Sequence, residues 1–330
     1  MAKIVAGVAT SHTPLLTLGA AQWIHRANVD YENPELNTSD GRLMTYSQLL
    51  TEVGPRYENE VDVPTLAKKE QQCNDALDKL AAFVAQVKPD VAIIIGDDQA
   101  ELFNSANQPA FAIYHGQTAY TIDKLQEPTT PDWLRTVRKG YMLDQVHGLP
   151  CDPQMALTLI KGLIDEEVDV AASDHVEDPL DKGFGHAYGF VVKRLFAGLP
   201  IPIVPVLLNT YFSPNVPSSR RCYNVGRAIR RVVEAIPGNQ RVMVIASGGL
   251  SHFVVDEPLD RQIIAAFENK DADFLQSIPR GALNSGSSEI LNWVTVAGAL
   301  EHLNVQSAEY FPLRRTPAGT GVGAGFVTWA

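Results

Sequence analysis

The sequence predicts an α/β fold, a single domain with a largely parallel central sheet flanked by helices. Two patterns support this prediction: short apolar runs rich in β-branched residues, and longer segments whose apolar residues recur every three or four positions. The first pattern is typical of strands buried on both faces, and the second of amphipathic helices. The two kinds of segment alternate with short joins, which is characteristic of α/β sheets.

Four apolar runs are predicted to be buried strands, and a shorter fifth run is predicted to add another. They cover residues 3–9, 91–95, 201–208 and 241–246, with the fifth at 111–114. In an open α/β sheet, ligands bind outside the carboxyl ends of the strands. Polar residues that directly follow these runs are therefore the first candidates for a functional site.

Three segments are predicted to be amphipathic helices, at residues 64–87, 154–167 and 219–236. In the first of them, apolar residues recur at three- and four-residue steps, while charged and amide residues occupy the other face. Pro89 and the pair Pro237-Gly238 end two of these helices before the next strand.

Residues 20–63 interrupt this pattern. The segment is polar and aromatic and shows only a weak helical periodicity at 44–53. An insertion of this length between a first strand and its crossover helix is more often functional or lid-like than idle. The alternative is a plain surface excursion.

Composition limits the class of protein. The 330 residues are 45% hydrophobic and can bury a large core. No apolar run approaches the roughly 18 residues that span a bilayer, and the N-terminus lacks a signal-peptide pattern, so we expect a cytoplasmic protein. A net charge of −11 argues against nucleic-acid binding, which relies on clustered Lys and Arg. The three cysteines are widely spaced and are interpreted as reduced, structural thiols.

Several polar residues follow predicted strands. His12 comes after the first strand, the run Asp97-Asp98-Gln99 after the second, and His252 after the last. Glu289 opens an amphipathic helix, and these distant residues could converge on a metal ion. Each has a structural alternative. His12 could be a helix cap or a buried imidazole, and His252 could be a turn residue. Asp97, Asp98 and Glu289 could be ordinary carboxylates at helix starts.

His186 lies between glycines and aromatic residues, which suits a ligand pocket or, equally, a packed and hydrogen-bonded histidine. The other five histidines have no such context. The glycine-rich run at 319–325 resembles a nucleotide loop only superficially, because it lacks the lysine of a phosphate loop and no helix follows it.

Five phrases in chain order resemble the class III extradiol ring-cleavage dioxygenases, the family of the protocatechuate 4,5-dioxygenase β subunit. They are Thr-Ser-His-Thr-Pro at 10–14, Asp-Asp-Gln at 97–99, Gly-His at 185–186, Ser-Gly-Gly-Leu-Ser-His at 247–252 and Glu-Ile-Leu-Asn-Trp at 289–293. The similarity runs over nearly the whole chain. Within the family it is closest to the gallate and 3-O-methylgallate dioxygenases.

The resemblance implies a non-haem Fe(II) centre made by two histidines and one carboxylate, with open positions for an aromatic substrate and O₂. By position, His12 and Glu289 would bind iron. His252 would be the acid/base residue, because a histidine that titrates near neutrality can take a catechol proton and return it. His186 would support the site or contact the substrate. The expected reaction inserts both oxygen atoms and opens the ring of a gallate-, methylgallate- or protocatechuate-type phenolic acid beside the diol.

One position departs from the family pattern, because the second iron-binding histidine aligns on Gln99. An amide oxygen binds Fe(II) more weakly than imidazole does, although the charge of the ligand set is unchanged. We expect Gln99 to ligate iron directly or through water. The alternatives are that Asp97 or Asp98 replaces it, or that the site no longer holds iron firmly. In that last case the protein would be a metal-dependent hydrolase or lyase, or a non-catalytic binding protein.

The resemblance also suggests how the pocket is closed. In relatives a separate subunit or domain can cover it, so we expect residues 20–63 to act as a lid over the pocket of the same chain or of a partner in a homodimer. The candidate substrate contacts are Trp23, Tyr31, Tyr46, Asp98 and Tyr211.

Overall fold

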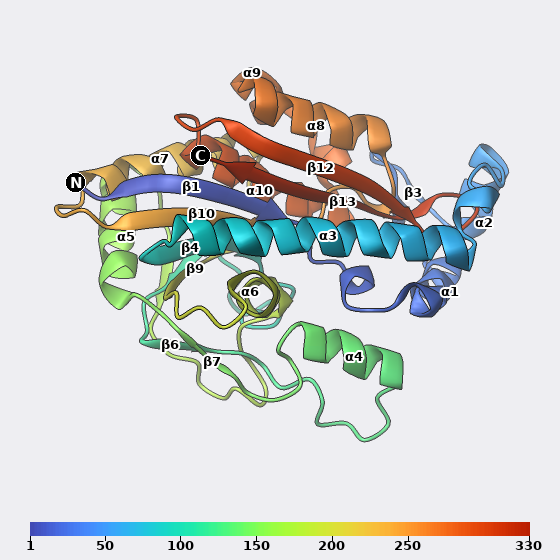
Figure 1. Ribbon diagram of the computed structural model, residues 1–330, viewed down its shortest axis with the longest axis horizontal. Coiled ribbons are helices and arrows are strands. Elements are labelled where there is room, and N and C mark those ends of the chain that lie inside the picture. The colour runs from blue at the N-terminus through green and yellow to red at the C-terminus, as the bar shows by residue number, and fades with distance from the viewer.

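The computed structural model describes residues 1–330 and is built around a nine-stranded mixed sheet with helices on both faces (Figure 1). Across the sheet the strands are β11 (His252–Val254), β13 (Thr320–Trp329), β1 (Lys3–Thr10), β10 (Arg241–Ser247), β4 (Val91–Asp97), β9 (Ile203–Leu208), β5 (Phe111–Tyr114) and β8 (Ala171–Ser173), with β12 (Val305–Arg314) paired to β13. The predicted α/β fold is confirmed.

The centre of the sheet is parallel. Strands β1, β10, β4 and β9 are parallel neighbours, and their register pairs Thr10 with Ser247, Ser247 with Gly96, and Asp97 with Leu208. The carboxyl ends of all four strands therefore lie at one edge. The segments that follow them, far apart in the sequence, meet there.

The burial of β4 explains why its sequence is continuously apolar. Val91, Ile93 and Ile95 pack into the core on one face. Ala92 and Ile94 pack into the core on the other. Side chains of a strand alternate between the two faces, so a strand covered on both sides must be apolar at every position.

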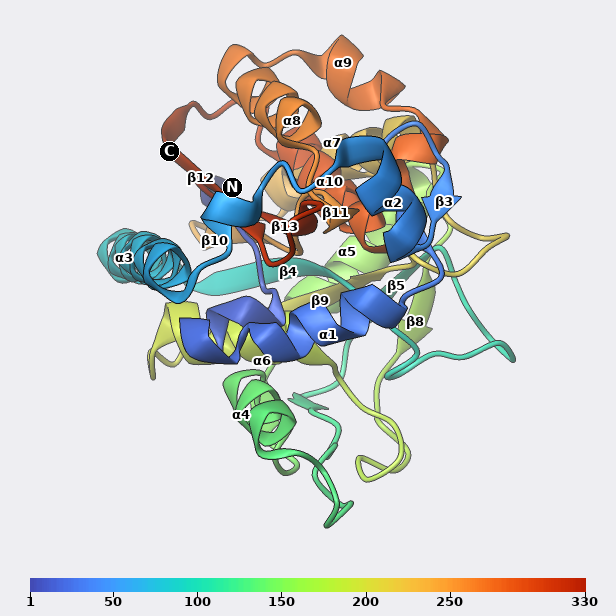
Figure 2. The ribbon, with the colours of Figure 1, turned by 90° about the vertical axis from the view of Figure 1, so that its right-hand side faces the viewer.

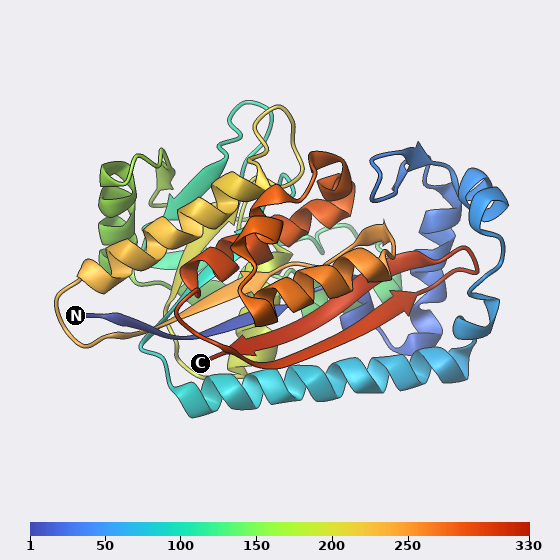
Figure 3. The same cartoon turned by 90° about the horizontal axis from the view of Figure 1, so that it is seen from above.

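Helices of different sequence regions cover the two faces (Figures 2 and 3). One face carries α5 (Pro153–Asp165), α7 (Ser219–Ala235) and α10 (Ile290–Ala299), with α8 (Glu257–Asn269) and α9 (Ala272–Ser277) beyond them. The other face carries the 25-residue helix α3 (Val63–Val87) and the short α6 (His186–Val191). None of these helices is both long enough and apolar enough to cross a bilayer.

The antiparallel hairpin β12–β13 was not expected from the sequence. It contains the glycine-rich run 319–325, whose glycines interrupt the alternation that marks a strand. A Cβ at Gly323 would lie 2.0 Å from Asp260 Oδ2, and a Cβ at Gly321 would lie 2.0 Å from the Leu313 carbonyl oxygen. Glycine is used here because neighbouring groups approach the strand closely.

The segment 20–63 is ordered into small elements. It contains α1 (Ile24–Glu32), a hairpin of β2 (Leu36–Asn37) and β3 (Leu43–Met44), and α2 (Tyr46–Val53). A further small unit contains β6 (Thr118–Tyr120), β7 (Gly148–Pro150) and α4 (Asp132–Gly140). In Figure 2, α1 and α4 lie on the same side of the sheet as α6.

Candidate metal centre and active site

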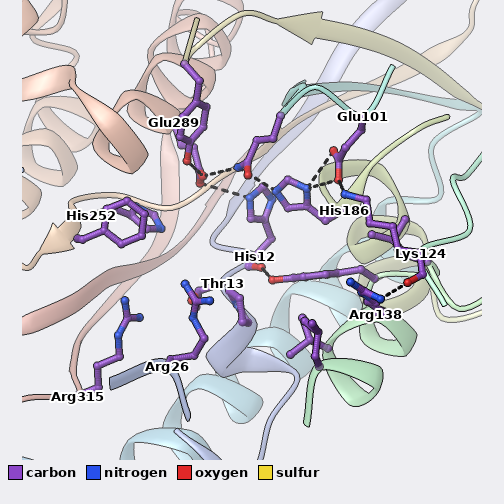
Figure 4. A pocket seen from close by; sticks show the side chains of 18 residues that line it. His12, Thr13, Arg26, Glu101, Lys124, Arg138, His186, His252, Glu289 and Arg315 are labelled. Atoms are coloured by element: carbon purple, nitrogen blue, oxygen red, sulfur yellow. Dashed lines mark hydrogen bonds and ion pairs between the residues drawn. The ribbon is translucent and has the colours of Figure 1, made fainter. Parts of the chain in front are cut away.

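A cavity of about 330 Å³ lies beyond the carboxyl ends of the central strands. Its wall includes three histidines, the carboxylates of Glu289 and Glu101, and four cationic side chains (Figure 4). An apolar cavity of roughly 150 Å³ holds a benzene ring. The cavity therefore has room for one substituted aromatic ring.

His12 follows β1, and its tautomer is fixed by Ser247 at the end of β10. The Ser247 hydroxyl donates to the Ala187 carbonyl at 2.7 Å, so its oxygen accepts from His12 Nδ1 at 2.9 Å. With the proton on Nδ1, His12 Nε2 carries a lone pair. This nitrogen is buried, has no hydrogen-bond partner and lies 3.3 Å from Glu289 Oε2.

Glu289 ends a 3-10 turn, Ser285–Glu289, that leads into α10. Its Oε1 accepts from the Tyr211 hydroxyl at 2.8 Å, and its Oε2 accepts from the Gly249 amide at 2.5 Å. Burial opposes ionisation of Glu289, but the neighbouring His252 and His12 outweigh it and lower its pKa. Glu289 is therefore a carboxylate, and its Oε2 faces His12.

Strand β4 brings Asp97 and Gln99 to the same place. Atoms of His12, Asp97, His186 and Glu289 that can bind a metal all lie within 4.8 Å of one another. Gln99 Nε2 lies among them, 3.0 Å from Asp97 Oδ2 and 3.3 Å from both His186 Nε2 and Glu289 Oε1. Burial and the nearby Glu289 raise the pKa of Asp97.

His186, the first residue of α6, is backed by an ion pair. Its Nδ1 lies 3.2 Å from each carboxylate oxygen of Glu101, and Lys124 Nζ lies 2.6 Å from Glu101 Oε1. Burial lowers the pKa of His186, but Glu101 outweighs burial and raises it to about 9. His186 is thus buried, hydrogen-bonded to Glu101 and part of the cavity wall.

His252 lies at the opposite side of the cavity from His186 (Figure 4). Its Nδ1 lies 2.8 Å from the Leu250 carbonyl oxygen, which can only accept, so the proton is on Nδ1. Burial lowers the pKa of His252. The ring is therefore neutral at pH 7, and its free Nε2 can accept a proton from a bound molecule.

Four cationic side chains also line the cavity, Arg26, Lys124, Arg138 and Arg315. Arg315 is paired with Asp30, and Lys124 with Glu101. Arg138 donates only to the Lys124 carbonyl and the Thr130 hydroxyl. Arg26 Nε is buried without a hydrogen-bond partner, and burial followed by the nearby Arg315 lowers the pKa of this guanidinium. Two guanidinium groups in this wall thus lack a carboxylate.

The structure brings together most of the residues predicted for the site. Six of them line or touch the cavity: His12, Gln99, His186, Tyr211, His252 and Glu289. The separation of His12 and Glu289 satisfies the distance that a shared metal ion requires.

Four predicted substrate contacts, Trp23, Tyr31, Tyr46 and Asp98, do not line the cavity. Trp23 is fully buried and donates to backbone carbonyls of the first loop. Tyr46 packs edge-on against Tyr31, with ring centroids 4.7 Å apart. Asp98 accepts from the amides of Leu102 and Phe103, as the alternative capping role anticipated.

Sequence reasoning missed five residues of the site. Glu101 follows Gln99 by two positions, and Ser247 directly follows the predicted strand 241–246. Both would have been found by extending the search for polar residues after strands. Lys124 lies in an irregular segment, and Arg138 and Arg26 lie in the helices α4 and α1, neither of which was predicted from the sequence.

Comparison with known proteins identifies the family. The model that describes the catalytic LigB subunit of aromatic ring-opening dioxygenases matches residues 53–319. The chain therefore belongs to this family of ring-opening dioxygenases, and a dioxygenase acting on an aromatic compound is consistent with the site.

Individual relatives are more distant. The gallate dioxygenase of Pseudomonas putida is 30% identical over 124 residues, which is 37% of this chain and 34% of that enzyme. The 2,3-dihydroxyphenylpropionate/2,3-dihydroxicinnamic acid 1,2-dioxygenase of Comamonas testosteroni is 24% identical over 189 residues, 57% of this chain and 51% of that enzyme. The matched segments thus span about a third and about a half of these relatives.

Proposed function

We propose that the protein is an Fe(II)-dependent extradiol dioxygenase that opens the ring of a catechol-like phenolic acid. One observation carries the proposal: the lone pair of His12 Nε2 is buried and unpartnered 3.3 Å from the Glu289 carboxylate. Two acceptors facing one another away from water are unfavourable unless a cation or a proton lies between them. Family membership in the ring-opening dioxygenases supports a metal ion.

The donor set suits ferrous iron. Imidazole and carboxylate ligands on one face, with open positions on the other, are typical of non-haem Fe(II) oxygenases. His12 and Glu289 would hold the ion. The third ligand would be Gln99, as the family pattern suggests, or His186. Bound iron would supply the electrons that activate O₂.

His252 would act as the acid/base residue. A catechol must lose protons when its oxygens bind a metal, and the neutral His252 ring presents an unprotonated Nε2 to the cavity. Tyr211 donates to Glu289 and keeps that carboxylate oriented. His252 can later return the proton to an oxygen of the ring-opened product.

An acidic substituent on the substrate is supported by the cationic wall. Arg26 and Arg138 have no carboxylate partner, and they lie in the same cavity as the acidic cluster. An anionic group placed there would neutralise a buried cation and form charge-assisted hydrogen bonds. Gallate, 3-O-methylgallate and protocatechuate all carry a carboxylate on the same ring as two vicinal oxygens.

The insertion 20–63 would serve as a lid that also contributes Arg26 to the cavity wall. A homodimer stays a prediction, and light scattering after gel filtration would measure the molar mass. Deletion of part of the insertion should weaken the binding of aromatic acids, and retained affinity would contradict the lid.

The decisive experiment is oxygen uptake after anaerobic loading with Fe(II), using protocatechuate, gallate and 3-O-methylgallate. We expect stoichiometric oxygen consumption and a yellow ring-opened product with at least one of them. The matched control is His12→Ala, which should lose both bound iron and activity. An iron-loaded protein that consumes no oxygen with any vicinal diol would contradict the proposal.

A further inference from the structure

We propose that His186, oriented by Glu101, is the second imidazole ligand of the metal ion, in the role that the family pattern would give to position 99. The inference rests on the proposed metal centre and concerns which side chains form it. Its starting point is the placement of His186 Nε2, 3.9 Å from Asp97 Oδ2 and inside the cluster that contains His12 and Glu289. Atoms bound to one ion at about 2.1 Å lie roughly 3–4 Å from one another, so small side-chain movements suffice.

Glu101 gives His186 the hydrogen bonding of a metal ligand. Histidines that bind metals usually donate their other ring N–H to a carboxylate or a carbonyl, which fixes the tautomer and raises the basicity of the ligating nitrogen. His186 Nδ1 lies 3.2 Å from both oxygens of Glu101, and Lys124 compensates the charge of that carboxylate. Nε2 therefore faces the cluster, and binding of a cation there replaces a proton.

The backbone around this pair is adapted to it. A Cβ at Gly185 would lie 1.4 Å from Glu101 Oε2, so only glycine lets the carboxylate reach the imidazole. His12 is arranged in the same way, with Nδ1 held by Ser247 and Nε2 directed inward. The two imidazole rings are 4.5 Å apart between centroids and steeply inclined, at 70°. Two histidines with fixed outer hydrogen bonds thus converge on one point.

Gln99 fits the role of ligand less well. Its amide nitrogen, which cannot bind a cation, lies near Asp97, His186 and Glu289. Asp97 and Glu289 can accept its two N–H groups, but His186, whose pKa is raised to about 9, presents a third N–H to the same nitrogen, so the amide does not satisfy all of its neighbours. If the amide turned over, its oxygen would face two carboxylates. Imidazole is also the better ligand for iron than an amide oxygen. The amide would move aside when the ion enters.

The test measures Co(II) binding by calorimetry, with the apo protein and three single variants. Wild type should bind one ion. His186→Ala should weaken binding by more than about 100-fold, because loss of the hydrogen-bond partner of a ligand already costs about 10–100-fold. Glu101→Gln should weaken it by about 10–100-fold. Gln99→Ala, the matched control, should stay within a few-fold of wild type.

Proton NMR of the Co(II)-loaded protein supplies a count that is independent of activity. Each coordinated histidine contributes one strongly shifted exchangeable N–H signal, and both Nδ1 protons here are buried in hydrogen bonds. We expect two such signals in wild type and in Gln99→Ala, and one in His186→Ala. His186→Gln, which keeps a donor for Glu101, replaces the alanine variant if thermal unfolding shows that the latter is unstable.

The outcomes separate the two proposals. If wild type binds Co(II) but His186→Ala keeps its affinity and both shifted signals, the role of His186 is overturned and the metal centre stands. Loss of binding in Gln99→Ala would equally overturn it. If His12→Ala binds as tightly as wild type, the metal centre itself fails, and this inference fails with it.

Discussion

Arg315 and Asp30 form a buried bidentate ion pair, with Nε–Oδ2 and Nη2–Oδ1 distances of 2.5 and 2.8 Å. Asp30 lies in α1 within the insertion, whereas Arg315 precedes β13, so the pair fastens the insertion to the sheet. Thr320 Oγ1 adds a third hydrogen bond to Asp30 at 2.6 Å. The segment that sequence reasoning treated as a possible loop is thereby part of the folded body.

Breaking this pair should be costly. Asp30→Ala leaves a buried guanidinium without its partner, and we expect a loss of about 3–5 kcal/mol in the free energy of unfolding. Chemical denaturation measures the change. The matched control is Asp40→Ala, which removes an exposed ion pair with Arg42 in the same insertion and should change stability little. Equal effects of the two variants would contradict the anchoring role of Asp30.

Arg26 should determine the preference for acidic substrates. Arg26→Ala should raise the KM for protocatechuate by about 10- to 100-fold, which corresponds to a hydrogen bond to a charged group. The KM for catechol, which has no carboxylate, should change much less. Arg26→Lys should recover part of the effect because it restores the charge. A similar rise in KM for both compounds would remove Arg26 from substrate recognition.

His252 should affect turnover and not metal binding. His252→Ala is expected to lower kcat by about 10²–10⁴, the usual contribution of a general acid or base. Gly249→Ala should have a smaller effect in the same direction, because its Cβ would lie 2.0 Å from His252 Cε1 and displace the ring. Gly19→Ala is the control, since a Cβ there meets no atom within 4 Å. Stopped-flow turnover and the metal content of each variant provide the comparison.

Asp260 should make the stability of the fold depend on pH. This fully buried carboxyl accepts hydrogen bonds from Ser251 and Tyr310, but burial raises its pKa to about 7. Between pH 4 and pH 7 the unfolded chain has lost this proton while the folded protein keeps it. The free energy of unfolding should therefore fall as pH rises, by up to about 4 kcal/mol.

Denaturation curves of Asp260→Asn measure this contribution, because the amide cannot titrate. The variant should lose the part of the pH dependence between pH 4 and pH 7 that Asp260 supplies. The exposed Asp165→Asn should retain the dependence of wild type. An unchanged slope in Asp260→Asn would show that another group is responsible.

The strands and the residues after them could be predicted from sequence because their signals are local. Continuous apolar runs mark β1 and β4, and the positions of His12 and Gln99 follow from where those runs end. The pairing of His12 with Glu289 required the family resemblance, since it depends on which strands are neighbours. Lys124 escaped prediction because it lies in an irregular segment, and Arg26 because it lies in the helix α1, which the sequence pattern did not indicate.

The glycines of β13 illustrate a second limit. They leave room for the Asp260 side chain and for a neighbouring backbone to approach the strand. Such close approaches depend on the folded structure and have no signal in the sequence. The contact of Glu101 with His186 could not be predicted for the same reason, because Gly185 and His186 lie more than 80 positions further along the chain.

The two ends of the cavity are built by different parts of the chain. Strand ends and α10 supply the acidic end, whereas α1 and α4, which lie outside the sheet, supply the unpaired guanidinium groups. Reactivity and substrate choice are therefore separable traits. New ring substituents could be accommodated by substitutions at Arg26 in α1 or Arg138 in α4 that leave the acidic end of the cavity unchanged.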